Sequence, residues 1–466
     1  MVTYVFEKNK GEPLYRQLYE FLRNDIISGV LAGGTKLPSK RAFADHLGVS
    51  KVTVEGAYSL LISEGYVYSL AKKGYFVEDS VDIKPHAAGK AHASVKEEES
   101  KKYAVDLSSN TVPPGQFPFS VWSKLMRNVC LDYRDELLLP MPYNGAENLR
   151  ESIAEFLFEQ RGMNVLPSQI IIGSGSEYFY SVIVRMLGND LIYAVEDPCY
   201  RRIALSYAQN GVERVPVPID KGGIITEKLK ELNPDVLHIS PSHNFPTGTV
   251  TGPRRRKEIL NAFFGANGKY IIEDDFDSEL RFNGKPIPTL YSSDPESRVI
   301  YMNTFSKTLA PSIRISYMVV PSSLAERCRS VVSAGGCPVS SFEQYTLAGF
   351  ISKGYFERHL NRNRKYYKCL RDSLISAYKD NPISKLSEIE ESDAGLHFFI
   401  KLYTDMDDEK VKTGLENAGI KVSFLSDYVA CPSKETQHRL LVNYSGLTVD
   451  GFLTAADKIC DIISSH

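Results

Sequence analysis

Lys307 lies in a short polar segment that follows the apolar run 299–302 and continues to a second cation, Arg314. A lysine amine becomes nucleophilic when burial or a neighbouring cation lowers its pKa, and it can then form an imine with an aldehyde. Arg314 carries a fork of donors that suits phosphate oxygens, and Thr304 and Ser306 add hydroxyl groups. Any single lysine is more often an ordinary surface residue. The strand-then-loop setting of Lys307 nevertheless favours a site for a phosphorylated aldehyde.

A Gly/Ser turn gives a second indication of phosphate binding. The apolar run 170–172 leads into Gly175, Ser176 and Glu177, where a helical pattern opens. Exposed amides at a helix N-terminus bind anions, helped by the helix dipole. Such a turn is often only a turn, so this prediction depends on the groups around Lys307.

Residues that follow three other apolar runs could hold an aromatic ring. A carboxylate buried at a strand end keeps a pyridine nitrogen protonated, and Asp274 is the candidate for this role. Any one of the three acids at 273–275 could instead belong to a solvated loop. Tyr200 could stack on the ring, and His243 or Asn244 could place a hydrogen-bond donor beside it.

The first part of the chain has a different pattern. Apolar residues recur at every fourth position in 14–26 and predict a helix. Ser39 is placed to cap a second helix over 40–47, and Ser50 to cap a third that runs to residue 64. Two alternating segments around a basic tip then predict a β-hairpin within 66–77. Two helices joined by a Gly-containing turn are typical of a helix-turn-helix.

The functional interpretation of this module is a winged helix that binds DNA. Its third helix would enter the major groove and its hairpin would contact the backbone or minor groove. The predicted DNA-contacting residues are Arg41, Lys51, Thr53, Lys72, Lys73 and Gly74. The alternative is a small helical domain used for protein contacts, because the module is only mildly basic and carries Glu55 on the same face.

Composition sets the domain plan. A chain of 466 residues is too long for one compact core, and its net charge of −2 requires any DNA contact to come from a local patch. We predict a DNA-binding domain at 1–78, a flexible polar linker at 79–103, and a third region at 104–466. In this third region strand-like and helical runs alternate, which predicts a largely parallel α/β sheet, with a smaller α+β subdomain mainly at 335–466.

The seven cysteines are scattered, without the spacing of a metal site or a disulfide framework. We therefore predict no metal. No apolar run approaches the length of a membrane span, and the expected location is the cytoplasm.

Several motifs carry a resemblance to known families. The stretch from PLYRQLYEF to KKGYFV resembles the GntR-type winged helix. Residues 105–466 resemble fold-type-I aminotransferases, and the motifs that carry this likeness are YNGAENLRESI, IIIGSGSEYF, EDPCYRRIA, SPSHNFPTGT, YIIEDDFDSELRF, VIYMNTFSKTLAPSIRISYMVVP and DAGLHF. Together they resemble the MocR/GabR (PdxR-like) subfamily of GntR transcriptional regulators.

The resemblance implies pyridoxal 5′-phosphate bound as an imine to Lys307, with Asp274 on the pyridine nitrogen and Tyr200 against the ring. It also implies a homodimer arranged head to tail, with exchanged domains, that binds double-stranded operator DNA. The residues implied to hold the phosphate are Gly175, Ser176, Thr304 and Arg314.

Three positions depart from the family pattern. Phe276 stands where relatives carry a tyrosine, so one hydroxyl near the cofactor is missing. Phe245 stands where aminotransferases carry an asparagine, with Asn244 or His243 as substitutes. Gly446 is placed where amino-acid-using relatives carry an arginine that grips the substrate carboxylate, a bidentate pair that is hard to replace.

These departures favour a sensor over a catalyst. The expected function is a transcriptional regulator that senses pyridoxal phosphate, or an amine or amino acid that reacts at Lys307. Control of vitamin B6 synthesis is the candidate role, and a GABA-type or D-amino-acid effector is the alternative. A true aminotransferase with an accessory DNA-binding domain, and a binding module with neither site active, are the other hypotheses.

Overall fold

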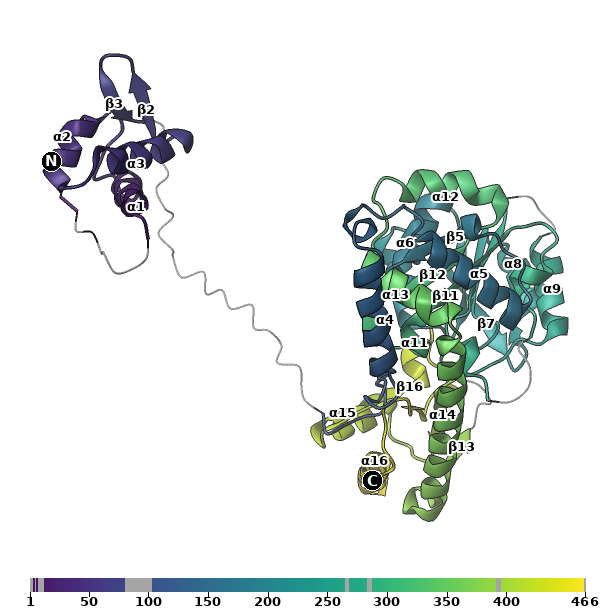
Figure 1. The fold of residues 1–466 in the computed structure, drawn as a ribbon. Coiled ribbons are helices and arrows are strands. Elements are labelled where there is room, and N and C mark those ends of the chain that lie inside the picture. The colour runs from purple at the N-terminus through teal and green to yellow at the C-terminus, as the bar shows by residue number, and fades with distance from the viewer. Residues whose placement is uncertain are drawn as a thin grey trace. The chain divides into compact units, whose positions relative to one another are not determined.

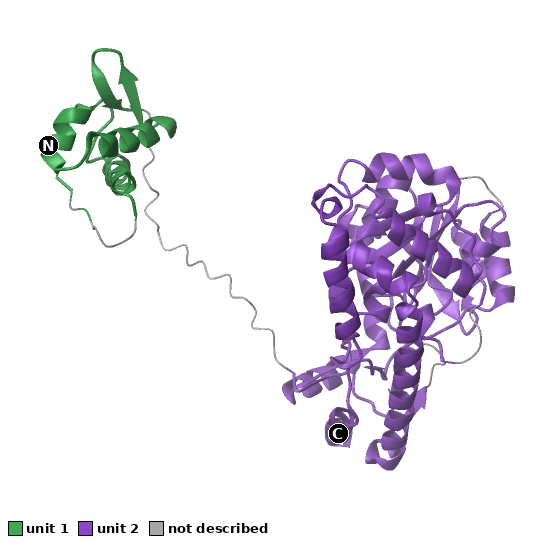
Figure 2. Cartoon of the chain, in the orientation of Figure 1, with its two compact units in different colours: residues 1–101 green, residues 102–466 purple. Residues whose placement is uncertain are grey.

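The computed structural model describes residues 3–4, 6, 12–79, 103–264, 268–282, 287–390 and 395–464. It divides the chain into two compact units, Met1–Lys101 and Lys102–His466 (Figure 2). Nearly all of the predicted linker lies outside the described residues.

The first unit is the predicted winged helix-turn-helix (Figure 1). Three strands in the order β1-β3-β2 pack with three helices around a core that includes Leu18, Val54 and Leu61. Ser39 accepts a hydrogen bond from the backbone N–H of Ala42, as the predicted cap of the second helix. The elements are α1 (Leu14–Ile27), β1 (Lys36–Leu37), α2 (Lys40–Leu47), α3 (Lys51–Ser63), β2 (Val67–Leu70) and β3 (Gly74–Val77).

The second unit is built on an eight-stranded sheet in the order β5-β12-β11-β10-β9-β6-β7-β8. Neighbours from β11 to β7 are parallel, while β12 and β8 run against their neighbours. The strands are β5 (Ile170–Gly173), β6 (Tyr193–Asp197), β7 (Arg214–Asp220), β8 (Gly223–Ile224), β9 (Val236–Ile239), β10 (Tyr270–Asp274), β11 (Val299–Thr304) and β12 (Ser316–Val319). The carboxyl ends of the parallel strands share one edge, which is where ligands bind in sheets of this kind.

Helices cover both faces of this sheet (Figure 1). Alternate residues of one strand enter different cores: Ile172 packs with the helices α5 and α13, whereas Ile171 packs with α6. This arrangement explains why the central strands are continuously apolar. The helices of this part are α4 (Phe119–Asp132), α5 (Glu147–Arg161), α6 (Ser176–Leu187), α7 (Arg201–Gln209), α8 (Thr226–Leu232), α9 (Pro253–Phe263), α10 (Leu290–Ser293), α11 (Phe305–Thr308), α12 (Ala325–Val332) and α13 (Ser341–Ser352).

A smaller α+β part follows along the long helix α14 (Tyr355–Asp380). Its four-stranded sheet has the order β13-β14-β17-β16, and a separate parallel pair joins β4 to β15. The remaining elements are β4 (Val105–Asp106), β13 (Ser387–Glu390), β14 (His397–Leu402), α15 (Asp408–Asn417), β15 (Ile420–Lys421), β16 (Ser423–Phe424), β17 (Arg439–Asn443) and α16 (Val449–Ser464).

The packing of this smaller part differs from the predicted range 335–466. Leu347 of α13 and Phe356 at the start of α14 belong to the core under the large sheet. The smaller core includes α14 only from Tyr366 onward, and it also includes Leu107 from the beginning of the unit. The apolar surface of α13 is buried against α4 and α5, so the chain leaves the large core only partway along α14.

Candidate functional site

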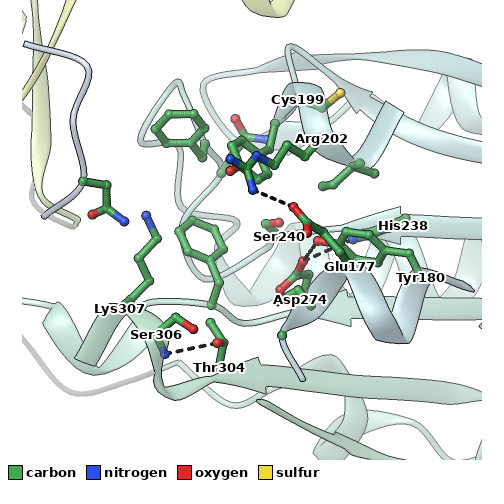
Figure 3. A pocket seen from close by; sticks show the side chains of 18 of the residues that line it. Glu177, Tyr180, Cys199, Arg202, His238, Ser240, Asp274, Thr304, Ser306 and Lys307 are labelled. Carbon is green, nitrogen blue, oxygen red and sulfur yellow. Dashed lines mark hydrogen bonds and ion pairs between the residues drawn. The ribbon is translucent and has the colours of Figure 1, made fainter. Parts of the chain in front are cut away.

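One cavity of about 410 Å³ lies at the carboxyl edge of the large sheet (Figure 3). Its volume is that of a small-molecule site. In Figure 3, Lys307 and Asp274 face the same space from the ends of neighbouring strands. The predicted cofactor residues that line the cavity are Gly175, Ser176, Glu177, Tyr200, Asn244, Asp274, Thr304, Ser306, Lys307 and Arg314.

Asp274, the last residue of β10, is buried in the wall of this cavity. Tyr180 donates a hydrogen bond of 2.9 Å to its Oδ2, and His238 Nε2 lies 3.5 Å from the same atom. Its Oδ1 is buried and has no hydrogen-bond partner among the described residues. A buried carboxylate oxygen without a donor is costly, so the site is suited to a ligand that brings a cationic N–H.

Lys307 is placed by the short helix α11, which begins directly after β11. Thr304 caps this helix by accepting a hydrogen bond of 3.1 Å from the backbone N–H of Ser306. Desolvation lowers the pKa of the Lys307 amine to about 8; the carboxylate of Asp277 opposes this and Arg202 adds to it. The amine lies 6.0 Å from the ring centre of Phe276. A lysine with this pKa is partly neutral near pH 7–8, as attack on an aldehyde requires.

The phosphate end of the cavity is formed by the N-terminus of α6 and by Arg314. Gly175 has φ of +96°, and a Cβ there would lie 2.7 Å from Arg314 Nη2. Only a glycine therefore allows the guanidinium to come this close to the amides at the start of the helix. Arg314 donates to the carbonyl of Ser174 at 3.2 Å and lies 3.6 Å from Glu177. Backbone amides and a guanidinium at one helix N-terminus suit a phosphate dianion.

Of the two cofactor residues predicted in the polar turn after β9, only Asn244 lines the cavity. It donates a hydrogen bond of 2.9 Å to Glu196 Oε2. His243, which we predicted as a cofactor residue, does not line it. Its Nδ1 lies 2.8 Å from Asp277 Oδ2, and its ring lies so close to Gly395 that a Cβ there would collide with it. His243 is therefore held behind the wall by these two neighbours.

Gly446 does not lie in the cavity, where we predicted it in place of an arginine that binds the substrate carboxylate. A Cβ at Gly446 would collide with Thr111 Oγ1. Leu441 of β17 belongs to one apolar cluster with the wall residue Phe245. The backbone pairing of β17 places Leu441 opposite Phe399 of β14. Among the described residues none of β17 lines the cavity, so this strand supplies no cation to its wall.

Some lining residues were not predicted. Tyr180, His238 and Arg202 lie within helices or strands. Arg202 belongs to the motif EDPCYRRIA, but nothing in that motif singles it out from Arg201. Arg202 is bound to Glu177 at 2.8 Å (Figure 3). Ser108 and Asn110 come from the beginning of the unit, far along the chain from the rest. Their role would be visible only from the three-dimensional pairing of that segment.

The winged helix places most of the predicted DNA-contacting residues on its surface. Arg41, Lys51, Lys72 and Lys73 are exposed, and Gly74 has φ of +115° where the hairpin turns. Thr53 differs, because its hydroxyl lies 2.9 Å from the hydroxyl of Ser50 and the residue is half-buried.

Two further residues lie on the same surface. Val52 is 75% exposed near the start of α3. Glu55 of α3 pairs with Lys40 of α2 at 2.5 Å, which neutralises one cation beside the recognition helix.

Both units of the chain match known protein families. Residues 14–77 match the model of the bacterial regulatory proteins of the gntR family, and residues 103–436 match aminotransferase class I and II. The HTH-type transcriptional regulator YdeL of Bacillus subtilis is 35% identical over 90% of this chain and 91% of its own length. The HTH-type pyridoxine biosynthesis transcriptional regulator PdxR of Corynebacterium glutamicum is 30% identical over 90% of both chains.

Solved structures show the same fold for the second unit. An archaeal alanine:glyoxylate aminotransferase superposes with a TM-score of 0.69 at 22% identity, covering 78% of this chain and 91% of that one. The kynurenine aminotransferase of Pyrococcus horikoshii gives a TM-score of 0.70 at 24% identity, covering 79% and 92%.

The class defined by these matches is a winged helix-turn-helix fused to a fold-type-I aminotransferase-like domain, the fold that holds pyridoxal phosphate. The chain belongs to the MocR-type branch of the GntR family of transcriptional regulators. The cavity fits this cofactor on its own chemistry: Asp274 Oδ1 for the pyridine N–H, the Lys307 amine for the aldehyde, and the Gly175–Arg314 pair for the phosphate.

Two searches of the described residues were negative. None of their helices is both long and apolar enough to cross a bilayer. No three of their His, Cys, Asp or Glu side chains are grouped as metal ligands would be.

Proposed function

We propose that the second unit is a sensor, and that Lys307 holds pyridoxal phosphate for recognition and not for turnover. The observation that carries this proposal is that, among the described residues, none from α14 to α16 lines the cavity, so β17 supplies no cation there for a substrate carboxylate. Phe245 and Phe276 line the cavity, and Phe276 offers no hydroxyl. The groups suited to hold the cofactor are present together in the same cavity. Rapid release of a keto acid from an amino acid would contradict the proposal and favour an aminotransferase.

Pyridoxal phosphate itself is the effector that these residues favour, with vitamin B6 synthesis as the regulated process. The name of the relative PdxR supports this assignment, because it connects a protein of the same architecture to pyridoxine biosynthesis. A ligand can shift the protein only by binding two states with different affinity. The test is the affinity of the protein for its operator with and without pyridoxal phosphate; equal affinities would rule this effector out.

A second candidate effector is an amine with an acidic group, such as a GABA-type compound or a D-amino acid. Arg202 lines the cavity and lies close enough to Lys307 to lower the pKa of its amine. Arg202 is paired with Glu177, so the acidic group of the effector would have to replace Glu177 as its partner. A screen of amines against the cofactor-loaded protein, read by absorption, separates this effector from pyridoxal phosphate alone.

For the first unit we propose operator binding in the cytoplasm through Arg41, Lys51, Lys72, Lys73 and Gly74. The exposure of the four cations around α3 and the hairpin tip supports this. Arg41→Ala or Lys51→Ala should weaken operator binding by about 1–3 kcal/mol where the contact is to a base edge. Neither change should alter the absorption of bound pyridoxal phosphate. We retain 1–78 and 104–466 as the limits of the DNA-binding and effector domains.

We also propose a homodimer. Large apolar side chains are exposed along α4 and the turn after it, at Phe119, Leu131, Leu138 and Leu139. Exposed apolar side chains of this size are typical of an interface between subunits. A second copy of the chain is the partner we expect there. The head-to-tail arrangement with exchanged domains stays a prediction.

A further inference from the structure

Two separate segments of the second unit form the wall of the cavity, and one of them supplies most of the lining residues. All of its described lining residues except Ser108 and Asn110 lie between Gly175 and Arg314, within the large part of the second unit. Ser108 and Asn110 belong to the segment 104–111, close to where the described part of this unit begins. No residue from α14 to α16 lines the cavity among those that the structure describes.

This segment is attached to the smaller α+β part. β4 pairs with β15 in parallel, and the backbone N–H of Ala104 donates to the carbonyl of Gly419 at 2.8 Å. Leu107 is fully buried in the smaller core. Its N–H donates to the Lys421 carbonyl at 2.9 Å, and its own carbonyl accepts from the N–H of Asn443 at 2.7 Å. The segment and the smaller part are therefore held together as one body.

The attachment continues up to the cavity. Ser445 donates to Asn110 Oδ1 at 3.4 Å and lies 3.5 Å from the carbonyl oxygen of Ser109. Gly446 packs directly against Thr111, with no room for a Cβ. The amide oxygen of Asn110 is thus engaged, while its N–H groups have no partner among the described residues. Asn110 lines the cavity, and an amide side chain whose oxygen is engaged still has two N–H groups that can donate to a ligand.

We propose that Asn110 contacts the ligand held at Lys307, and that the segment 104–111 carries the effect of this contact to the smaller part and to the chain that leads to the DNA-binding unit. The inference rests on the sensor function proposed above. It follows from the wall composition, because Ser108 and Asn110 are the described residues through which this body touches the cavity directly. A ligand that binds Asn110 more strongly in one position of that body than in another selects that position.

The test uses full-length protein, pyridoxal 5′-phosphate as the probe, and an operator selected from random DNA by the protein itself. Two quantities are measured for each variant: the absorption of bound pyridoxal phosphate, and the ratio of operator Kd values with and without it. Asn110→Ala should weaken pyridoxal phosphate binding a few-fold and bring the Kd ratio at saturation to within about twofold of one. Its operator affinity without pyridoxal phosphate should equal that of the wild type.

Gly446→Ala tests transmission without changing a cavity residue, because its methyl group would displace Thr111. This variant should still load pyridoxal phosphate but lose the change in operator affinity. Adding Thr111→Ala removes the colliding oxygen and should restore the response. Gly414→Ala is the matched control, since its Cβ would meet only Ile462 at an ordinary 3.4 Å; it should respond as the wild type does.

The outcomes separate the two proposals. If pyridoxal phosphate, alone or with amines, does not change the operator affinity of the wild type, the sensor function is wrong and this inference is wrong with it. A responsive wild type combined with normal responses in Asn110→Ala and Gly446→Ala would overturn this inference alone. Failure of Gly446→Ala to bind pyridoxal phosphate would also overturn it, because the segment would then hold the ligand and not transmit its presence.

Discussion

Tyr180 binds one oxygen of Asp274 and leaves the other buried and unpaired. We propose that the unpaired oxygen accepts a hydrogen bond from the pyridine N–H of the ligand, and a hydrogen bond between charged groups is worth about 1.5–3 kcal/mol. Asp274→Asn should therefore raise the Kd for pyridoxal phosphate about 10- to 100-fold in an absorption titration. Tyr180→Phe keeps the carboxylate and should raise this Kd less than Asp274→Asn does. Wild-type affinity in Asp274→Asn would show that this carboxylate does not hold the ring.

Attachment of pyridoxal phosphate at Lys307 should depend on pH with a midpoint near 8. Only the neutral amine attacks an aldehyde, so the rate should rise as pH increases through the pKa of about 8 and then level off. A free lysine would give a midpoint near 10.4. Asp277→Asn removes the carboxylate that raises the pKa of Lys307, so its midpoint should move to lower pH. Stopped-flow absorption of the apoprotein from pH 6 to 9 measures both, and an unchanged midpoint in Asp277→Asn would refute the assignment.

Val52 should contact a thymine methyl group in the operator. Its side chain is exposed near the N-terminus of α3, while the hydroxyl of Thr53 is engaged by Ser50. Replacing one thymine by uracil removes a methyl group and should cost about 0.8 kcal/mol, roughly fourfold in Kd. In Val52→Ala, replacing that thymine by uracil should not change the operator Kd. Replacing any other contacted thymine should weaken binding as much as it does in the wild type. Additive losses at every thymine would exclude the contact.

The pair of Lys40 and Glu55 should limit the attraction of the first unit to phosphates. Glu55→Gln removes a negative charge from α3 and frees Lys40. Each additional phosphate contact makes the plot of log K against log salt steeper by about 0.9. We expect tighter binding at low salt and a steeper slope, measured by fluorescence anisotropy. Glu20→Gln on the exposed surface of α1 changes the charge equally and serves as the control; an identical effect there would point to net charge alone.

Charged residues at the apolar surface after α4 should separate the proposed dimer. A fully buried leucine contributes about 1.5–3 kcal/mol. Leu138→Asp with Leu139→Asp should therefore weaken self-association by more than about 100-fold in sedimentation experiments. Leu232→Asp, at another partly exposed leucine, should leave it unchanged. A dimer that survives the double change would place the interface elsewhere.

The sequence was most informative where function and local structure coincide. Lys307, Asp274 and Gly175 each follow a strand that ends at the same edge of the sheet, so a strand-then-loop pattern was enough to group them. The caps Ser39 and Ser50 likewise mark α2 and α3, because a cap is a contact between residues three apart.

The sequence was least informative where pairing between distant segments decides the position of a residue. Asn110 reaches the cavity because β4 pairs with β15, more than 300 residues further along the chain. Gly446 packs against Thr111 and does not line the cavity, because its place is set by the pairing of β17 with β14. A shift of a few residues in a strand changes which side chain faces the site, and the local sequence does not determine it. The position of His243 similarly depends on Gly395 and Asp277, two residues that are remote in sequence.

The loop that joins β11 to the antiparallel β12 carries both Lys307 and Arg314. One stretch of backbone therefore sets the separation between the amine and the phosphate-binding guanidinium. Pyridoxal without its phosphate could reach the amine but would not be held at the other end. A sensor built on this connection would therefore distinguish pyridoxal phosphate from pyridoxal that lacks the phosphate.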